Sequence, residues 1–297
     1  MLKRSSCNSL LLAAALTAVY CQPVLAAPPS GTLNYTYFTP ANVEDGPDSE
    51  VTQQDLRLTL PAGFYGKPED GAVIIKVNLA ERQFSMNHSG RSDEVLRVYD
   101  ISVPVRYMKK LNDERSFSAG VIPSLNSSME HLQSDDFTFS AYGQHSWKLE
   151  NHNYSLGLLY GRLLGADRLI PIGGYSYTGK ENLELTLGFP ATGVRYYPQK
   201  SYSYFAGFFP YGGSWHVYDD GDSDRDYYLR QTGYRFGGGV TFDIGGPWQL
   251  QFEAGQQFAQ QLEIDESDGF DSEIDIENST YVGISLNLKA PSPGDNK

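Results

Sequence analysis

The chain has 297 residues, of which 40% are hydrophobic and 13% aromatic, and a formal net charge of −13 at pH 7. Such an acidic protein is a poor partner for nucleic acid, because the phosphates would repel it. Cys7 and Cys21 are the two cysteines and both lie near the start of the chain, so the rest offers no disulfide, thiolate metal ligand or cysteine nucleophile.

The first 26 residues have the pattern of a secretory signal peptide. Lys3 and Arg4 give a charged start, residues 10–19 are apolar, and small residues precede the expected cleavage site. Because Pro28 disfavours a cut after Ala27, we expect cleavage between Ala26 and Ala27. That cut removes both cysteines and, with Lys3 and Arg4 gone, takes the formal charge from −13 to −15.

Beyond the signal peptide, apolar and polar residues alternate with a period of two, which is typical of strands with one apolar face. No later stretch approaches the roughly 18 apolar residues of a membrane helix, so any membrane crossing must use strands. The expected strands lie near residues 32–37, 56–60, 73–79, 99–107, 117–125, 137–147, 154–161, 168–177, 183–189, 193–198, 202–218, 234–242, 248–259 and 281–288.

Two of these segments have special features. Pro104 lies inside residues 99–107 and cannot donate a ladder hydrogen bond, so a bulge or a locally open pairing is expected there. Residues 193–198 are short and fit either a separate strand or a bulged continuation of the preceding one. If this segment or the first one does not cross the membrane, the number of strands falls from about 14 to 12.

Residues 248–259 give the clearest strand. Trp248, Leu250, Phe252, Ala254 and Phe258 alternate with a second face that is rich in glutamine. The segment is about twice as long as an ordinary strand, and about 9–11 tilted residues suffice to cross a bilayer. It predicts a transmembrane strand with one lipid-facing side.

Together these patterns predict an all-β protein, a transmembrane antiparallel up-and-down β-barrel of about 14 strands. Long polar loops mostly alternate with short turns, so both termini are expected in the periplasm. A soluble β-sandwich also alternates apolar and polar residues. Long strands, no helical pattern and aromatic residues near strand ends, such as Tyr99 and Tyr107, favour the barrel. The expected division is a signal peptide at 1–26, a barrel at 27–288 and a polar tail at 289–297.

A resemblance to a known family rests on residues 169–197. This block contains the runs Pro171-Ile172-Gly173-Gly174-Tyr175, Leu183-Glu184-Leu185-Thr186-Leu187-Gly188-Phe189-Pro190 and Arg195-Tyr196-Tyr197. It resembles an uncharacterised family of bacterial outer-membrane β-barrels catalogued as a domain of unknown function. The resemblance implies a barrel and transfers no functional residues. One departure is that the chain runs past Leu288 to Lys297, where many such barrels end on an aromatic residue used in assembly.

Charged residues on the polar faces are the candidates for lining a pore. Positive groups outnumber negative ones among them, and structural salt bridges inside the barrel are the alternative interpretation. Because 12–14 strands lie between small packed barrels and aqueous porins, both an open and a plugged lumen fit. The candidates are Arg57, Lys76, Asp100, Arg106, Glu184, Arg195, Arg235 and Glu253.

Catalytic and metal-binding signals are weak. His145 and Ser146 are adjacent, so on a strand they point to opposite faces and cannot pair as base and nucleophile. His216 is close in sequence to Asp219, but no serine motif accompanies it. Asp220, Asp222 and Asp224 have the spacing of a calcium loop, yet Arg225 replaces the glycine that an EF-hand needs. We therefore expect no enzyme, no cofactor and no dedicated metal site.

The function expected from these observations is a porin-like passive diffusion channel for small polar solutes in the bacterial outer membrane. A closed structural or surface-interaction barrel that uses its acidic loops is the alternative, and an outer-membrane hydrolase is a third. The expected partners are membrane lipid, lipopolysaccharide bridged by divalent cations to acidic residues 219–226 and 263–277, and the barrel assembly machinery. The sequence does not predict an oligomeric state.

Overall fold

The computed structural model describes residues 31–44, 49–88, 94–161, 167–179, 182–218, 226–266 and 271–289. The expected signal peptide, nearly all of the polar tail, and Asp219, Asp220, Asp222 and Asp224 lie outside these residues. Within them, no helix is long and apolar enough to cross a bilayer.

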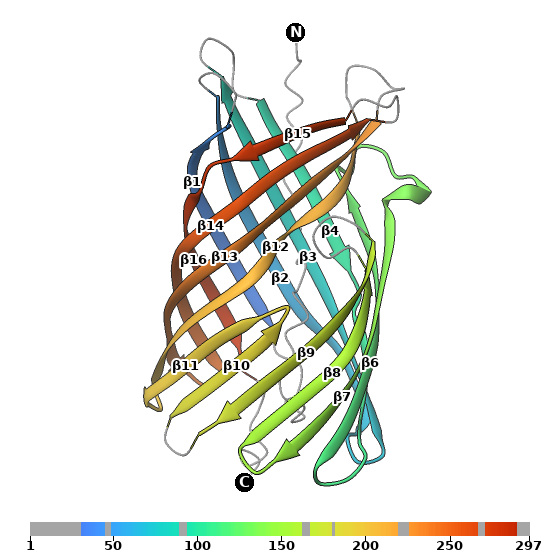
Figure 1. Cartoon of the computed structure of the whole chain (residues 1–297), viewed down its shortest axis with the longest axis vertical. Coiled ribbons are helices and arrows are strands. Elements are labelled where there is room, and N and C mark those ends of the chain that lie inside the picture. The colour runs from blue at the N-terminus through green and yellow to red at the C-terminus, as the bar shows by residue number, and fades with distance from the viewer. Residues whose placement is uncertain are drawn as a thin grey trace.

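Almost all of the described chain is β-strand, with one short 3-10 helix, η1 (Ser134–Asp136), before β7. The strands tilt strongly and wrap around a single axis (Figure 1). They are β1 (Thr32–Asn42), β2 (Ser49–Lys67), β3 (Gly71–His88), β4 (Glu94–Ser102), β5 (Val105–Lys110), β6 (Arg115–Ser127), β7 (Phe137–Leu149), β8 (His152–Gly161), β9 (Arg168–Thr178), β10 (Leu183–Phe189), β11 (Thr192–Gln199), β12 (Tyr202–Tyr218), β13 (Asp226–Gly245), β14 (Trp248–Glu266), β15 (Asp271–Ile276) and β16 (Ser279–Leu288).

These strands form a closed antiparallel ring in which chain neighbours are also spatial neighbours. β13 pairs with β14, and β16 pairs with both β14 and β1, so the ring closes. Two places in the ring are each filled by two consecutive segments instead of one continuous strand. These segments are β4 followed by β5, and β15 followed by β16. The sixteen described segments therefore fill 14 positions, which confirms the predicted up-and-down barrel.

One local prediction is also confirmed, and one open alternative is decided. The chain is interrupted between Ser102 and Val105, and Pro104 serves only as an acceptor, through its carbonyl oxygen, for the Lys76 amide at 3.1 Å. The separate strand β11 replaces the open choice at residues 193–198, pairing with both β10 and β12.

The lengths of two connections were predicted wrongly. The expected strands ended near residues 79 and 259, but β3 continues to His88 and β14 continues to Glu266, followed by β15. In these extensions apolar and polar residues still alternate, but the apolar ones, such as Phe84, Leu262 and Ile276, point into the barrel and the polar ones point outward. An alternation with the apolar residues outward therefore marks the lipid-facing part of a strand, and the reversed alternation marks its continuation.

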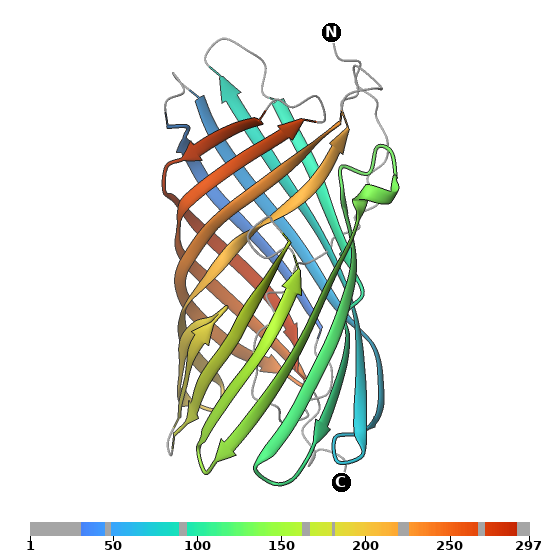
Figure 2. The same cartoon turned by 45° about the vertical axis from the view of Figure 1, so that its right-hand side comes forward.

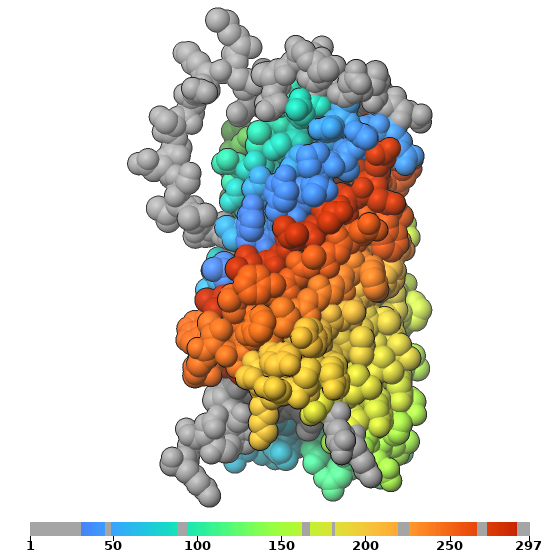
Figure 3. Space-filling model, turned by 90° about the vertical axis from the view of Figure 1, so that its left-hand side faces the viewer, coloured from blue at the N-terminus to red at the C-terminus, as the bar shows by residue number. Residues whose placement is uncertain are grey.

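The barrel has a turn end and a loop end. Short connections such as residues 68–70, 150–151 and 246–247 define the turn end, and the longer connections at 89–93 and 219–225 define the loop end. Thr32 pairs with Asn287, so the first and last barrel strands meet at the turn end. The outer surface shows β1, β16, β14 and β13 wrapping obliquely side by side (Figure 3).

The wall is uneven around the ring. β7 to β11 are shorter than β12 and β13 and lie mainly toward the turn end (Figure 2). β11 pairs with β12 only up to Phe208, and at the loop end β12 instead meets β6, where the Ser128 amide donates to the His216 carbonyl at 3.0 Å. Among the described residues, 209–215 of β12 form ladder pairs with β13 alone.

The two faces of β14 follow the predicted alternation up to Ala259. Trp248 and Phe252 are both 44% exposed on the outer face, as lipid-facing side chains should be. Ala259 then adopts a left-handed conformation with φ +48°, and the register with β13 shifts there. This bulge reverses the faces, so the apolar Leu262 points into the barrel and is fully buried.

Candidate lumen site

The inward faces meet in a charged network that crosses the lumen. Asp55 on β2 accepts a hydrogen bond from the phenol of Tyr211 on β12. β2 and β12 are not neighbours in the ring, so this contact can form only through the interior. We call the set Gln53, Asp55, Arg57, Arg82, Tyr211, Gln231 and Arg235 the central network.

Asp55 is the electrostatic centre of this network. Its carboxylate is 2.9 Å from Arg57 Nη2, 3.1 Å from Arg82 Nε and 3.6 Å from Arg235 Nη2. The Asp55 and Arg82 side chains are each 1% exposed. Charges removed from water to this extent are tolerated only when they are paired and hydrogen-bonded.

Two glutamine side chains, Gln53 and Gln231, link Asp55 to Arg82 by further hydrogen bonds. Gln53 Nε2 donates to Asp55 at 2.8 Å, and Gln231 Nε2 donates to Gln53 Oε1 at 2.8 Å. Gln231 Oε1 accepts from Arg82 Nη1 at 2.7 Å. The chain of donors thus joins β2, β3 and β13, which fixes opposite walls relative to one another.

Arg235 is held by aromatic rings as well as by Asp55. Its guanidinium carbon lies 3.4 Å from the ring centre of Tyr211, 4.3 Å from that of Phe38 and 5.0 Å from that of Tyr281. Aromatic faces attract cations, most strongly when the pair is shielded from water. These rings help to keep a third positive charge beside one carboxylate.

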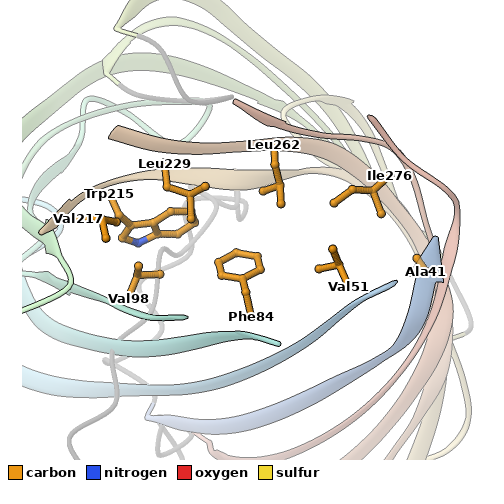
Figure 4. Packing of buried hydrophobic residues seen from close by; sticks show 9 residues of the cluster. All are labelled: Ala41, Val51, Phe84, Val98, Trp215, Val217, Leu229, Leu262 and Ile276. Carbon is orange, nitrogen blue, oxygen red and sulfur yellow. The ribbon is translucent and has the colours of Figure 1, made fainter. Parts of the chain in front are cut away.

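An apolar layer lies on the loop-end side of the central network. Side chains from opposite walls point toward one another across the lumen (Figure 4), and all are 6% exposed or less. Trp215 connects the two layers, because the guanidinium of Arg82 lies 4.7 Å from its ring centre. Its Nε1 also donates to Asp100 at 2.9 Å. This apolar layer consists of Ala41, Val51, Phe84, Val98, Trp215, Val217, Leu229, Leu262 and Ile276.

On the turn-end side many inward groups are polar or charged, and several of them, such as Ser203 and Thr241, are buried. Glu184 is exposed and accepts from the Tyr197 phenol at 3.0 Å. Arg195 Nη1 donates to Ser203 at 2.9 Å and to Thr241 at 3.1 Å. This turn-end half combines polar groups with a small buried apolar cluster of Ala72, Ile74 and Met108, whereas the loop-end half is closed by the apolar layer.

The eight predicted pore-lining residues separate into three groups. Arg57 and Arg235 belong to the central network, and Asp100 is joined to it through Trp215, whose ring lies beside Arg82. Lys76 and Arg106 lie on the adjacent strands β3 and β5. The remaining three bond to other lumen residues: Glu184 to Tyr197, Arg195 to Ser203 and Thr241, and Glu253 to Tyr281.

Sequence reasoning missed Asp55, Arg82 and the apolar layer. Asp55 and Arg57 are two residues apart on one strand and so share a face, which was a usable signal. The inward position of Leu262 was hidden because the bulge at Ala259 interrupts the alternation.

His216 is at a different place, on the outer side of the loop end. Its Nδ1 is 2.9 Å from Asp136 and its Nε2 is 2.9 Å from Asp226. The ring also stacks on Tyr228 with centroids 4.7 Å apart. Both ring nitrogens therefore face carboxylates. Through these contacts His216 on β12 holds η1, which carries Asp136, and β13, which carries Asp226 and Tyr228, against β12. Among the described residues, no group of three or more His, Cys, Asp or Glu side chains has the arrangement of a metal site.

No protein-family model and no curated protein matches this chain, so the resemblance to a family of unknown function stays an expectation. Solved structures of bacterial barrels are similar at low identity. The NanC porin is 12% identical over 87% of this chain and 99% of its own, with a TM-score of 0.37. An outer membrane channel from Pseudomonas putida F1 is 12% identical over 87% and 94%, with a TM-score of 0.45. Outer membrane phospholipase A from Escherichia coli is 10% identical over 90% and 98%, with a TM-score of 0.38.

Proposed function

We propose that the protein is a porin-like outer-membrane channel for small polar solutes. The observation that carries this proposal is the charged central network spanning the lumen. A barrel that serves only as a packed scaffold needs no such network, because apolar side chains fill a small interior at lower desolvation cost. Polar interiors are typical of barrels that hold water.

The exposed apolar face supports residence in a membrane. Leu156, Phe236 and Val282 lie on three different strands and are 61%, 58% and 53% exposed. A belt of such side chains around the ring is stable in lipid and prone to aggregation in water. With the expected signal peptide, this belt favours the bacterial outer membrane, where lipopolysaccharide and the assembly machinery are the proposed partners.

Conduction requires the apolar layer to move. Phe84 and Leu262 are 1% and 0% exposed, and a hydrophobic constriction excludes water and ions until it widens. We therefore propose a channel that is closed at its loop-end half in this structure.

The second candidate is a closed structural or surface-interaction barrel. The apolar layer favours it directly, since its side chains join opposite walls and close the lumen. Its loop end carries acidic groups for contact, including Glu263 and Asp265, which bind Arg230 at 2.8 and 3.2 Å. We propose that the neighbouring acidic loops recruit divalent cations.

Reconstitution in planar lipid bilayers separates the two candidates. A channel should give stable unitary conductance, and Phe84→Ala should increase its size or its open fraction by thinning the apolar layer. Phe252→Ala, a substitution of the same size on the outer face, should leave conductance unchanged. A correctly folded protein whose wild type and Phe84→Ala variant both fail to conduct would support the closed barrel.

The hydrolase alternative has little structural support. A general base needs a free ring nitrogen toward its nucleophile, and both nitrogens of His216 are within 2.9 Å of carboxylates. Lipid hydrolysis by the purified protein that disappears in His216→Ala would revive this alternative.

A further inference from the structure

Lys76 and Arg106 are two positive side chains at the turn-end half of the lumen. Both face inward, because Lys76 shares its strand face with the buried Ile74 and Asn78, and Arg106 shares its face with the buried Met108. Arg106 pairs directly with Ile74, two residues before Lys76. Diagonal neighbours in an antiparallel pair are about 7–8 Å apart, within reach of long side chains.

Neither side chain has a counter-ion among the described residues. Arg57, Arg82, Arg195 and Arg235 all bind a carboxylate or a hydroxyl group in the lumen. Lys76 and Arg106 make no such contact within the described part of the chain. The Arg106 Nε atom is shielded from solvent without a hydrogen-bond partner.

A third donor lies beside them on β6. Ser118 pairs with Met108, which is two residues from Arg106, and its side chain is on the inward face and 1% exposed. Its hydroxyl also lacks a hydrogen-bond partner within the described residues. Three adjacent strands thus contribute unpartnered donors to one region of the lumen wall.

We propose that Lys76 and Arg106, with Ser118 beside them, form a binding station for small oxyanions, the solutes that carry a carboxylate or a phosphate group. Two neighbouring cations repel each other, and an anion between them reverses the sign of that interaction. Guanidinium and ammonium groups bind carboxylate and phosphate oxygens by charge-assisted hydrogen bonds. This inference adds a solute class to the proposed channel function, and its binding test does not depend on conduction.

Binding of inorganic phosphate to the full-length folded protein in non-ionic detergent tests the station, with equilibrium dialysis as the measurement. We expect one saturable site per chain. Lys76→Gln and Arg106→Gln should each weaken binding by about tenfold, the usual scale for one hydrogen bond to a charged group. Lys76→Arg keeps the charge and should retain binding. The folded state of each variant is checked by heat-modifiable mobility in gels.

Arg195→Gln is the matched control, because it removes another lumen cation that already has partners in Ser203 and Thr241. It should leave phosphate affinity within about twofold, a difference under 0.5 kcal/mol. Three results would each contradict the proposed phosphate site. They are an equal loss of phosphate affinity in Arg195→Gln, a loss of affinity in Lys76→Arg, and no saturable phosphate binding by the wild type. If the protein conducts but does not bind phosphate, the anion site is contradicted and the channel function is not. If it binds phosphate but does not conduct, the channel function is contradicted and the anion site is not.

Discussion

Asp55 on β2 and Tyr211 on β12 are separated by 156 positions in the chain, and a hydrogen bond across the lumen joins them. The bond connects opposite walls of the barrel, so it can form only when the whole ring is closed and not within any single hairpin. Because Asp55 also pairs with Arg57, Arg82 and Arg235, its charge should matter for both stability and opening.

Asp55→Asn should destabilise the barrel strongly. The substitution keeps the side-chain shape but leaves buried guanidinium groups without their counter-ion, and breaking a buried pair in this way costs about 3–5 kcal/mol. Urea unfolding in lipid vesicles, followed by tryptophan fluorescence, measures the free energy of unfolding. Asp113→Asn is the control, since its side chain is 98% exposed and a hydrogen bond from Lys110 lowers the pKa of Asp113, so the same charge is removed. Similar stabilities of the two variants would contradict the role of the central network.

A pair of arginine substitutions tests which side chains of β14 face the lipid and which face the lumen. Phe252→Arg places a charge on the lipid-facing side, which costs about 2–4 kcal/mol at the bilayer midplane. Gln251→Arg adds the same charge to the inward face, where Gln251 accepts from Thr241 at 3.2 Å, and should be tolerated better. Folding into vesicles, measured by gel mobility, compares them. Equal penalties would contradict the register, because a shift of one residue exchanges the two faces.

Gly255 should not tolerate even a methyl group. A Cβ atom there would lie 2.3 Å from the Phe236 carbonyl oxygen and 2.6 Å from the Gly237 Cα, both of which are backbone atoms on β13. We expect Gly255→Ala to cost about 1–3 kcal/mol, as overpacking does elsewhere. Gly143→Ala is the control, since its Cβ would meet nothing within 4 Å. Thermal unfolding in detergent compares the variants, and a smaller loss for Gly255→Ala than for Gly143→Ala would refute the close approach.

His216→Ala should loosen the loop end without affecting the central network. Asp136 is fully buried and would lose its imidazole partner while keeping the Tyr218 phenol at 3.2 Å and the Gln133 amide at 2.9 Å, and loss of one hydrogen bond to a charged group costs about 1.5–3 kcal/mol. Hydrogen exchange should then accelerate at Ser128 and Tyr218, whose amides bond across the contact between β12 and residues 127–128. His145→Ala, on the outer face of β7, should leave these amides unchanged. If the exchange rates of these two amides are unchanged in His216→Ala, the His216 contacts do not hold β12 against residues 127–128.

The mature protein should begin at Ala27. Its intact mass after purification from membranes should correspond to loss of the first 26 residues, and its detergent-free periplasmic fraction should be empty. A different amino terminus would correct the cleavage site, whereas recovery in the soluble fraction would contradict membrane residence.

The sequence alone determined the class of fold, the strand positions and most of their faces. Each of these depends on local features: a period of two for the faces, Pro104 for the interruption between β4 and β5, and Gly245-Gly246 for the turn into β14. It also placed Arg57, Arg106 and Arg235 on the inner side, because side-chain direction follows from alternation alone.

Only the tertiary structure decided which inward side chains meet. The pairing of Asp55 with Tyr211, and of Trp215 with Asp100, depends on ring closure and on the stagger accumulated around the barrel. The apolar layer depends further on the bulge at Ala259, which turns Leu262 inward. A period of two says which face a residue occupies, but its partner across the lumen is set by the geometry of all the strands together.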